Sequence, residues 1–233
     1  MPLTVPGRIV VLSGAGLSAE SGLGTFRDVG GLWDEYDLEE VATPEGYAAD
    51  PAKVLAFYDA RRANMVAAAP NAAHRALARL SRRDGVTLVT QNIDDLLERA
   101  GAADVIHMHG ELARALCHTC GHRWDAPPAM GSADRCPLCA AAAARPDVVW
   151  FGEMPYRMDL IEHRLSAADL FVSIGTSGTV YPAAGFAAQA AQSGARTLEL
   201  NMEASGGAFD AVRVGPATET VPAWVDEVMA TPS

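Results

Sequence analysis

Short apolar runs, each the length of one strand, recur along the chain and are separated by stretches with helical character. The runs lie at residues 8–12, 86–89, 170–174, 197–200 and 212–214. Runs of this length, next to glycine or polar residues, are typical of buried strands. Helical stretches lie between them, for example at 71–82 and 94–100. Strands that alternate with helices predict an α/β fold, in which a parallel sheet carries helices on both faces.

Two segments interrupt this alternation. Residues 30–70 have a largely helical pattern, and residues 113–146 contain all four cysteines, several prolines and an alanine-rich stretch. We interpret both as insertions that together form a small domain, with a helical part and a cysteine-containing part. The main domain then consists of residues 1–29, 71–112 and 147–233.

The cysteines form two CxxC pairs separated by fifteen residues: Cys117, Cys120, Cys136 and Cys139. Two such turns can bring four thiolates to one point, which is the ligand set of a tetrahedral zinc ribbon. Four protein ligands leave no position for water, so this zinc is expected to be structural. Buried or redox-active cysteines are the alternative. A zinc ribbon can also serve as an interaction module, but its place inside a large α/β chain favours a stabilising role.

The first apolar run leads directly into a glycine-rich turn. Gly14, Ala15 and Gly16 begin a segment that fits G-x-G-x-x-[GA]. Glycines after a strand allow a tight turn and a close approach of backbone to a diphosphate, as in Rossmann-like folds. A dehydrogenase also needs an acidic residue at the end of the second strand, about 20 residues further on. Asp34 and Glu35 lie near that distance but not in a strand-like segment, which weakens the dehydrogenase interpretation.

Three polar clusters follow predicted strands or loops. Phe26 and Arg27 lie side by side in a glycine-broken segment that suits a lid, although a solvated loop with Phe26 in the core is the alternative. The cluster at 91–94 follows the second strand, and His109 precedes the cysteine segment. Ligands of open α/β sheets bind at the carboxyl ends of the strands. The clusters together therefore predict an active site there.

Charge and hydropathy narrow the classes of partner. The net charge of -11 argues against nucleic acid as a partner, because phosphate recognition needs a basic face. No apolar stretch approaches 18 residues, so we expect no membrane span and no membrane partner. We expect a cytoplasmic protein, and a monomer.

The ordered set of motifs resembles the sirtuin family of NAD-dependent protein deacylases. It runs from Gly14-Ala15-Gly16 through Thr25-Phe26-Arg27, Gln91-Asn92-Ile93-Asp94, His109-Gly110 and the four cysteines to Val148-Val149-Trp150-Phe151-Gly152-Glu153, Gly175-Thr176-Ser177, Asn201, Gly215-Pro216-Ala217 and Pro222. The resemblance is greatest to the bacterial and mitochondrial class III type, which removes succinyl and malonyl groups. Gly24 departs from the pattern, since many relatives have proline there, and we expect only a looser lid.

The resemblance implies a site for NAD, the co-substrate. The residues that would hold it are Gly14, Ala15, Gly16, Glu20, Phe26, Arg27, Gln91, Asn92, Ile93, Asp94, Gly175, Thr176, Ser177, Asn201 and Ala217. Asn92 and Asp94 would line the nicotinamide pocket, and Phe26 would cover the reacting ribose. The acyl oxygen of the substrate would attack the ribose as nicotinamide leaves. His109 would be the general base, since a neutral imidazole can accept a proton at physiological pH.

The same resemblance implies a peptide site and an acyl site. Val149, Phe151, Gly152 and Glu153 would pair with an extended substrate peptide that carries the acylated lysine.

On a helix, Tyr58 and Arg61 would share one face, where a phenol and a guanidinium make a carboxylate receptor. Ala42 would leave room for a longer acyl group. The alternative is an amphipathic helix with Tyr58 half-buried and Arg61 in a surface ion pair.

The predicted enzyme prefers succinyl and malonyl groups, with glutaryl as a further candidate, and deacetylates more weakly. Its products are free lysine, nicotinamide and 2'-O-acyl-ADP-ribose. An acetyl-specific deacetylase and a mono-ADP-ribosyltransferase on the same site are the alternatives. A zinc-containing binding module without activity and a hydride-transfer dehydrogenase are competing classes. His109, Asn92 and Asp94, the three predicted catalytic residues, favour an enzyme over the binding module.

Overall fold

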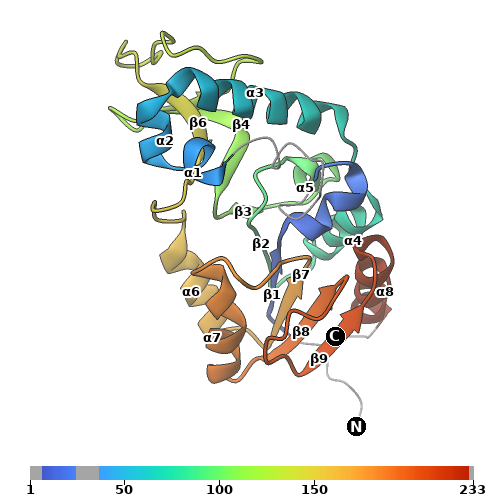
Figure 1. The fold of residues 1–233 in the computed structure, drawn as a ribbon. Helices are drawn as coiled ribbons and strands as arrows, with labels where there is room; N and C mark the ends of the chain where they lie inside the picture. The colour runs from blue at the N-terminus through green and yellow to red at the C-terminus, as the bar shows by residue number, and fades with distance from the viewer. Residues whose placement is uncertain (1–6, 25–36, 231–233) are drawn as a thin grey trace.

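The computed structural model describes residues 7–24 and 37–230, and a six-stranded parallel sheet forms its centre (Figure 1). The strand order is β3-β2-β1-β7-β8-β9. The strands are β1 (Ile9–Ser13), β2 (Val86–Thr90), β3 (Ile106–His107), β7 (Leu170–Ile174), β8 (Arg196–Asn201) and β9 (Ala211–Val214). All five predicted strands are confirmed, and the parallel α/β fold is confirmed with them. The two-residue strand β3 is additional.

Helices cover both faces of this sheet, as the uninterrupted apolar runs predicted. Helices α4 (Ala72–Leu80) and α8 (Ala217–Ala230) lie on one face, and α6 (Met158–Ser166) and α7 (Phe186–Gln192) lie on the other (Figure 1). The strand β1 shows why: Ile9 and Val11 belong to the core under α4 and α8, whereas Val10 and Leu12 belong to the core under α6 and α7. Alternate side chains of one strand point to opposite faces, so both sets are buried.

The order of the strands reverses between β1 and β7, and there the glycine-rich turn lies. Two short 3-10 turns, Ala15–Leu17 and Ala19–Ser21, follow β1. A Cβ atom on Gly16 would lie only 2.7 Å from the Cα of Gly175, which has a φ of 59°. The turns after β1 and β7 therefore meet backbone to backbone, and only glycine permits this approach. Such a switch point is where open α/β sheets bind ligands.

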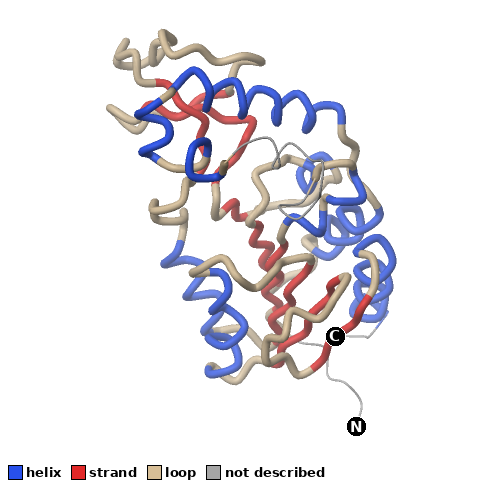
Figure 2. Tube along the Cα trace, in the orientation of Figure 1, coloured by secondary structure: helices blue, strands red, loops and turns tan. Residues whose placement is uncertain are grey.

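A second group of elements lies beside the carboxyl ends of the sheet (Figure 2). Its helices are α1 (Leu38–Val41), α2 (Pro44–Ala49) and α3 (Pro51–Ala67), and its antiparallel strands are β4 (Gly110–Cys117), β5 (Arg123–Asp125) and β6 (Ala144–Val148), in the order β5-β4-β6. Asp50 caps α3 by accepting a hydrogen bond from the backbone N–H of Lys53. The described part of 30–70 is helical as predicted, but this sheet was not predicted.

The predicted domain boundaries fall inside strands of the antiparallel sheet. β4 begins at Gly110 and β6 ends at Val148, on the far sides of the boundaries drawn at 112 and 147. The division into two domains stays a prediction. The remaining elements are α5 (Leu96–Arg99) and the 3-10 turn Ala183–Gly185. None of the described helices combines the length and the apolar character that crossing a membrane requires.

Candidate active site

A network of buried and partly buried polar side chains fixes Asn92 and Asp94 in the 91–94 segment. The Asn92 amide donates to the carbonyl of Gly14 and to the Ser18 hydroxyl, both at 3.1 Å. The Ser18 hydroxyl in turn donates to the Asp94 carboxylate at 2.9 Å. Burial raises the pKa of Asp94, while the backbone N–H of Leu96 and the Ser18 hydroxyl oppose that rise. The two predicted pocket residues, Asn92 and Asp94, are therefore held in one orientation.

His74 completes this network, and sequence reasoning missed it. Burial lowers the pKa of His74 to about 4, so its imidazole is neutral near pH 7. Its Nδ1 atom accepts the backbone N–H of Asn71, at 3.2 Å. The proton therefore lies on Nε2, which faces the Ser18 hydroxyl at 3.3 Å. Ser18 can then accept from His74 and Asn92 while it donates to Asp94, and the direction of every hydrogen bond is determined.

One backbone contact fixes the ring of His109. Its Nδ1 atom is 3.2 Å from the carbonyl oxygen of Gln91. A carbonyl only accepts hydrogen bonds, so Nδ1 carries the proton and Nε2 carries a lone pair. Burial lowers the pKa of His109. The arrangement therefore presents a neutral imidazole with the tautomer that a general base requires.

The second histidine of this region, His107, has a structural place. Its Nδ1 atom contacts the carbonyl oxygen of Asn92 at 3.2 Å, and its Nε2 atom contacts the Glu98 carboxylate at 2.8 Å. Although burial disfavours the charged imidazole, the hydrogen bond and the charge of Glu98 raise the pKa of His107. The ring thus ties the 91–94 segment to Glu98 of α5.

The glycine-rich turn uses its backbone N–H groups for packing. Gly14 donates to the carbonyl of Ile174 at 2.9 Å, and Gly16 donates to the carbonyl of Gly175 at 2.8 Å. Both N–H groups are thus occupied by the turn after β7. The expected contact between these two groups and a diphosphate does not follow from this geometry. What the glycines clearly provide is the close approach of the two turns.

The Nε2 atom of Gln91 is the feature near the switch point that fits a nucleotide best. It is buried, and it has no hydrogen-bond partner among the described residues. A buried amide donor without a partner is costly, and a ligand hydroxyl or carbonyl would satisfy it. The donor is therefore consistent with a polar ligand beside Gln91, one of the residues that the resemblance assigns to NAD.

The residues that the resemblance places around the adenosine half of NAD lie in the turn after β7, at the end of β8 and at the start of α8. Asn201 donates to the carbonyl of Thr176 at 3.0 Å and to the buried Glu199 at 3.2 Å. Ser177 contacts the Thr179 hydroxyl at 2.7 Å.

Glu20 and Ala217 meet where α8 begins. Both carboxylate oxygens of Glu20 accept from Thr218, at 3.1 and 2.7 Å, so Glu20 caps the start of α8. Ala217, the first residue of that helix, is buried. Phe26 and Arg27 lie outside the described residues.

On α3 the predicted acyl receptor is close to the catalytic segment. Tyr58 is 1% exposed, more deeply buried than the alternative interpretation allowed. Arg61 is half-buried, and its guanidinium carbon lies 5.7 Å from the centroid of the Phe57 ring. Burial lowers the pKa of Arg61, while the nearby Tyr58 and Asp94 oppose that shift. The Tyr58 phenol and the Asp94 carboxylate therefore both lie close enough to stabilise the Arg61 cation.

The next residue along, Arg62, makes a largely buried ion pair with Asp59. Arg62 donates to Asp59 at 2.6 Å and to the carbonyl of Leu112 at 3.0 Å. It also reaches the carbonyl of Pro128 at 3.5 Å and the sulfur of Met130 at 3.6 Å. The two adjacent arginines of α3 thus have different surroundings. Arg61 lies near Tyr58 and Asp94, whereas Arg62 connects α3 to the antiparallel unit.

The predicted peptide-binding segment runs from the end of β6 past the site. Val149 N–H donates to the carbonyl of His109, and Phe151 N–H donates to the carbonyl of Ala42, both at 2.9 Å. Phe151 is exposed, whereas Ala42 is buried beneath it. Gly152 has a φ of 88° and open space where a side chain would be. The segment is thereby fixed on one side to His109, the predicted general base, and on the other to Ala42 of the predicted acyl pocket.

Glu153 is engaged within the protein. Its carboxylate accepts two hydrogen bonds from Arg145, at 2.6 and 2.8 Å. It also accepts the backbone N–H of Trp150, at 2.9 Å. Although burial opposes it, the hydrogen bonds from Arg145 and from the Trp150 backbone lower the pKa of Glu153. Glu153 therefore fixes the backbone of the predicted peptide-binding segment at Trp150 and links it to Arg145.

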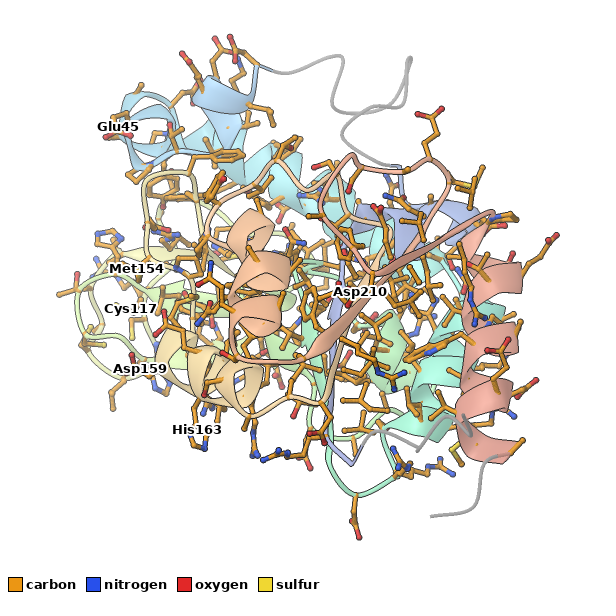
Figure 3. The ribbon with its side chains drawn as sticks, turned by 90° about the horizontal axis from the view of Figure 1, so that it is seen from below. Glu45, Cys117, Met154, Asp159, His163 and Asp210 are labelled. Carbon is orange, nitrogen blue, oxygen red and sulfur yellow. The ribbon has the colours of Figure 1, made fainter. Side chains whose placement is uncertain are left out.

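The four cysteines meet in the antiparallel unit, as their spacing predicted. All four sulfur atoms lie within 4.8 Å of one another. The pairs Cys117–Cys139 and Cys120–Cys136 are each 3.7 Å apart, close to the roughly 3.8 Å expected between sulfurs bound tetrahedrally to zinc. The residues fit a structural zinc. Cys117 lies on the opposite side of the molecule from α8 (Figure 3), so the cysteine cluster is distant from that helix.

A parallel sheet with a glycine turn at its switch point, a buried unpaired amide and a neutral histidine define a nucleotide-dependent α/β enzyme. Comparison with known proteins supports and refines this class. The Sir2 family model matches residues 14–182. The NAD-dependent protein deacylase of Caulobacter vibrioides is 58% identical over 96% of this chain and 97% of its own. That of Pasteurella multocida is 49% identical over 95% of this chain and 98% of its own.

Solved structures agree with this assignment. A Sir2 homologue crystallised with NAD matches with a TM-score of 0.88 and 38% identity, over 96% of this chain and 90% of that one. A Sir2 protein with a deacetylated p53 peptide and 3'-O-acetyl ADP-ribose matches with a TM-score of 0.79 and 26% identity, over 95% of this chain and 94% of that one. The chain belongs to the Sir2 family, the sirtuins. It is an NAD-dependent protein deacylase.

Proposed function

We propose that this sirtuin removes acidic acyl groups from lysine side chains in preference to acetyl. Succinyl and malonyl are the preferred groups, glutaryl is a further candidate, and deacetylation is weaker. The products are free lysine, nicotinamide and 2'-O-acyl-ADP-ribose. The observation that carries the proposal is the Tyr58–Arg61 pair beside Asp94. It puts a phenol and a cation next to the segment that the resemblance assigns to the reaction.

The electrostatics of the pair favour a carboxylate ligand. Burial lowers the pKa of Arg61, which means that water stabilises its charge poorly. An acyl carboxylate would stabilise this cation, and a guanidinium can donate to both of its oxygens. Burial also raises the pKa of Tyr58, so the phenol keeps its proton and can donate a third hydrogen bond. An acetyl group offers no carboxylate to either donor.

The residues around His109 support the chemical steps of the proposal. NAD supplies the ribose carbon that accepts the acyl oxygen when nicotinamide leaves. His109 Nε2, with its lone pair, would remove a proton from a ribose hydroxyl, and that hydroxyl would then attack the former acyl carbon. Asn92 and Asp94, fixed through Ser18 and His74, would line the pocket for nicotinamide. We propose that the other residues predicted from the resemblance to contact NAD and the substrate peptide do so as well.

A direct comparison of two acyl groups tests this function. Peptides that differ only in succinyl or acetyl on the lysine are incubated with the protein, with and without NAD, and nicotinamide release is measured. We expect release only with NAD, and a larger kcat/KM for the succinyl peptide. Equal kcat/KM values would overturn the acidic preference. Transfer of ADP-ribose to protein without deacylation would favour the alternative transferase activity.

We further propose that the enzyme works as a monomer in a reducing cytoplasm. The four cysteines can bind zinc only as reduced thiolates, which a reducing compartment maintains. Sedimentation of the purified protein tests the monomer, and cell fractionation tests the compartment. A stable dimer, or recovery outside the cytoplasm, would contradict these two points.

A further inference from the structure

A hydrogen bond joins the peptide-binding segment to the proposed acyl receptor. The indole N–H of Trp150 donates to the hydroxyl oxygen of Tyr58 at 3.0 Å. Both side chains are buried, at 3% and 1% exposed. An indole N–H can only donate, so the phenol oxygen must be the acceptor. The proton of Tyr58 therefore points away from Trp150 and remains to be donated in another direction.

The indole is itself fixed by its neighbours. The Arg145 guanidinium lies over the Trp150 ring, 3.4 Å from its centroid, in a cation–π contact. Glu153 accepts from Arg145 and from the backbone N–H of Trp150. The Tyr47 ring packs against the indole, with centroids 5.1 Å apart. Ring rotation would break these contacts, so the direction of the indole N–H is set by the protein.

A buried indole N–H needs a partner in any protein, so the bond could serve stability alone. Two observations favour a further role. The first is that the acceptor of the indole N–H is the Tyr58 phenol of the proposed receptor. Because the Tyr58 oxygen accepts this hydrogen bond, its own proton must point in another direction. Trp150 also lies between Val149 and Phe151, in the segment proposed to pair with the peptide. The same element would thus hold the peptide and orient the receptor.

We propose that Trp150 is a positioning residue for acyl selectivity, which orients the Tyr58 hydroxyl so that it donates to the carboxylate of the acyl group. The Arg145–Glu153 pair fixes the indole for this purpose. The inference rests on the proposed acidic-acyl preference and deepens it. Trp150 itself touches neither the reacting atoms nor the acyl carboxylate in this account.

The test uses Trp150→Phe, which keeps an aromatic ring and removes the N–H donor. We expect KM for the succinyl peptide to rise roughly 3- to 10-fold, the range that one net hydrogen bond provides. The kcat for that peptide and both constants for the acetyl peptide should change less than about twofold. Equal losses with both peptides would show a merely structural role and would overturn the inference.

A double-variant comparison shows whether Trp150 acts through Tyr58. In a Tyr58→Phe background the phenol is already absent, so adding Trp150→Phe should not raise the succinyl KM further. A full additional loss in that background would overturn the inference. Tyr47→Phe is the matched control. It removes a hydroxyl that bonds the carbonyl of Ala144 at 3.0 Å, and the succinyl-to-acetyl ratio should stay unchanged.

Arg145→Lys keeps the test decisive if Trp150→Phe fails to fold. It retains the charge, loses the bidentate contact to Glu153 and should lower the succinyl-to-acetyl ratio in the same direction. An unchanged ratio would count against the inference. The failure of the underlying function is distinguishable. If Tyr58→Phe and Arg61→Met lower both activities equally, the acidic preference is wrong. If those two variants act selectively and Trp150→Phe does not, only the present inference is wrong.

Discussion

The catalytic side and the acyl side of the site are held in different ways. His109 and the 91–94 segment are fixed largely by backbone carbonyls and by a closed set of buried hydrogen bonds through Ser18 and His74. The acyl side consists of side chains on α3, which reach the site through Tyr58 and Arg61. A site built on backbone anchors resists substitution. If the proposed roles are right, we expect substitutions on α3 to change acyl selectivity and to leave the chemistry intact.

The largest effect is expected from His109→Tyr on the catalytic side. Loss of the general base should lower kcat for both acyl peptides by roughly a hundredfold to ten-thousandfold. Nicotinamide release is the measurement, and thermal unfolding checks that the fold is kept. His107→Gln is the matched control, because His107 contacts the backbone of Asn92 and Glu98 and is expected to keep most activity. An active His109→Tyr variant would contradict the assignment of the base.

The next largest effect concerns His74, whose pKa is about 4 in the folded protein and near ~6.5 when unfolded. Between these values the unfolded chain binds the extra proton. The free energy of unfolding should therefore fall as the pH drops from about 6.5 to 4, by up to about 3 kcal/mol.

Urea titrations across this pH range measure the effect, with His163→Gln, a change at an exposed histidine of α6, as the control. In His74→Gln the slope should be smaller. An identical slope in that variant would show that another group causes it.

Arg61→Met tests the acyl side. Removal of a charged donor should lower kcat/KM for the succinyl peptide by roughly 10- to 100-fold, with the acetyl value changed less than about twofold. Arg62→Met is a control one residue away. It should lower stability, because it leaves Asp59 without its buried cation, and keep the succinyl-to-acetyl ratio. Equal losses for both peptides in Arg61→Met would refute the carboxylate receptor.

The smallest effect is expected from Glu98→Gln. The change removes the charge that faces His107 at 2.8 Å and loosens an outer anchor of the 91–94 segment. Because Glu98 is exposed at the surface, the loss of kcat should be only about two- to threefold. It should be the same for both acyl peptides. A selective loss with the succinyl peptide would contradict the separation of the 91–94 segment from acyl selectivity.

The sequence predicts well what depends on local pattern. The buried strands, the glycine turn and the cysteine pairs each have a short-range signal, and the structure contains all of them. The sequence predicts poorly those strands that contain buried charged residues or that are very short. β6 contains Arg145 and Asp147, which are both buried, so its hydropathy does not indicate a strand. β3 has only two residues, too few for any pattern.

The pairings that organise the site lie beyond such patterns. Ser18 meets His74 across 56 residues, and Tyr58 meets Trp150 across 92. Each of these residues has an ordinary local explanation, so only the fold reveals its partner. The Asn71-x-x-His74 capping box gave a weak signal, because an N-terminal cap with a histidine at the third helical position is identifiable in the sequence.

Arg62 connects two properties that would otherwise be independent. Its contact with Leu112 joins α3 to β4, and its contacts with Pro128 and Met130 join α3 to the loop that leads into the second cysteine pair. If that loop loosens when the metal is lost, the helix face next to Arg62 loses its anchor, while the backbone anchors of His109 lie elsewhere. The unfolding temperature of a purified batch would then report its metal content. Batches would differ in stability before they differ in selectivity.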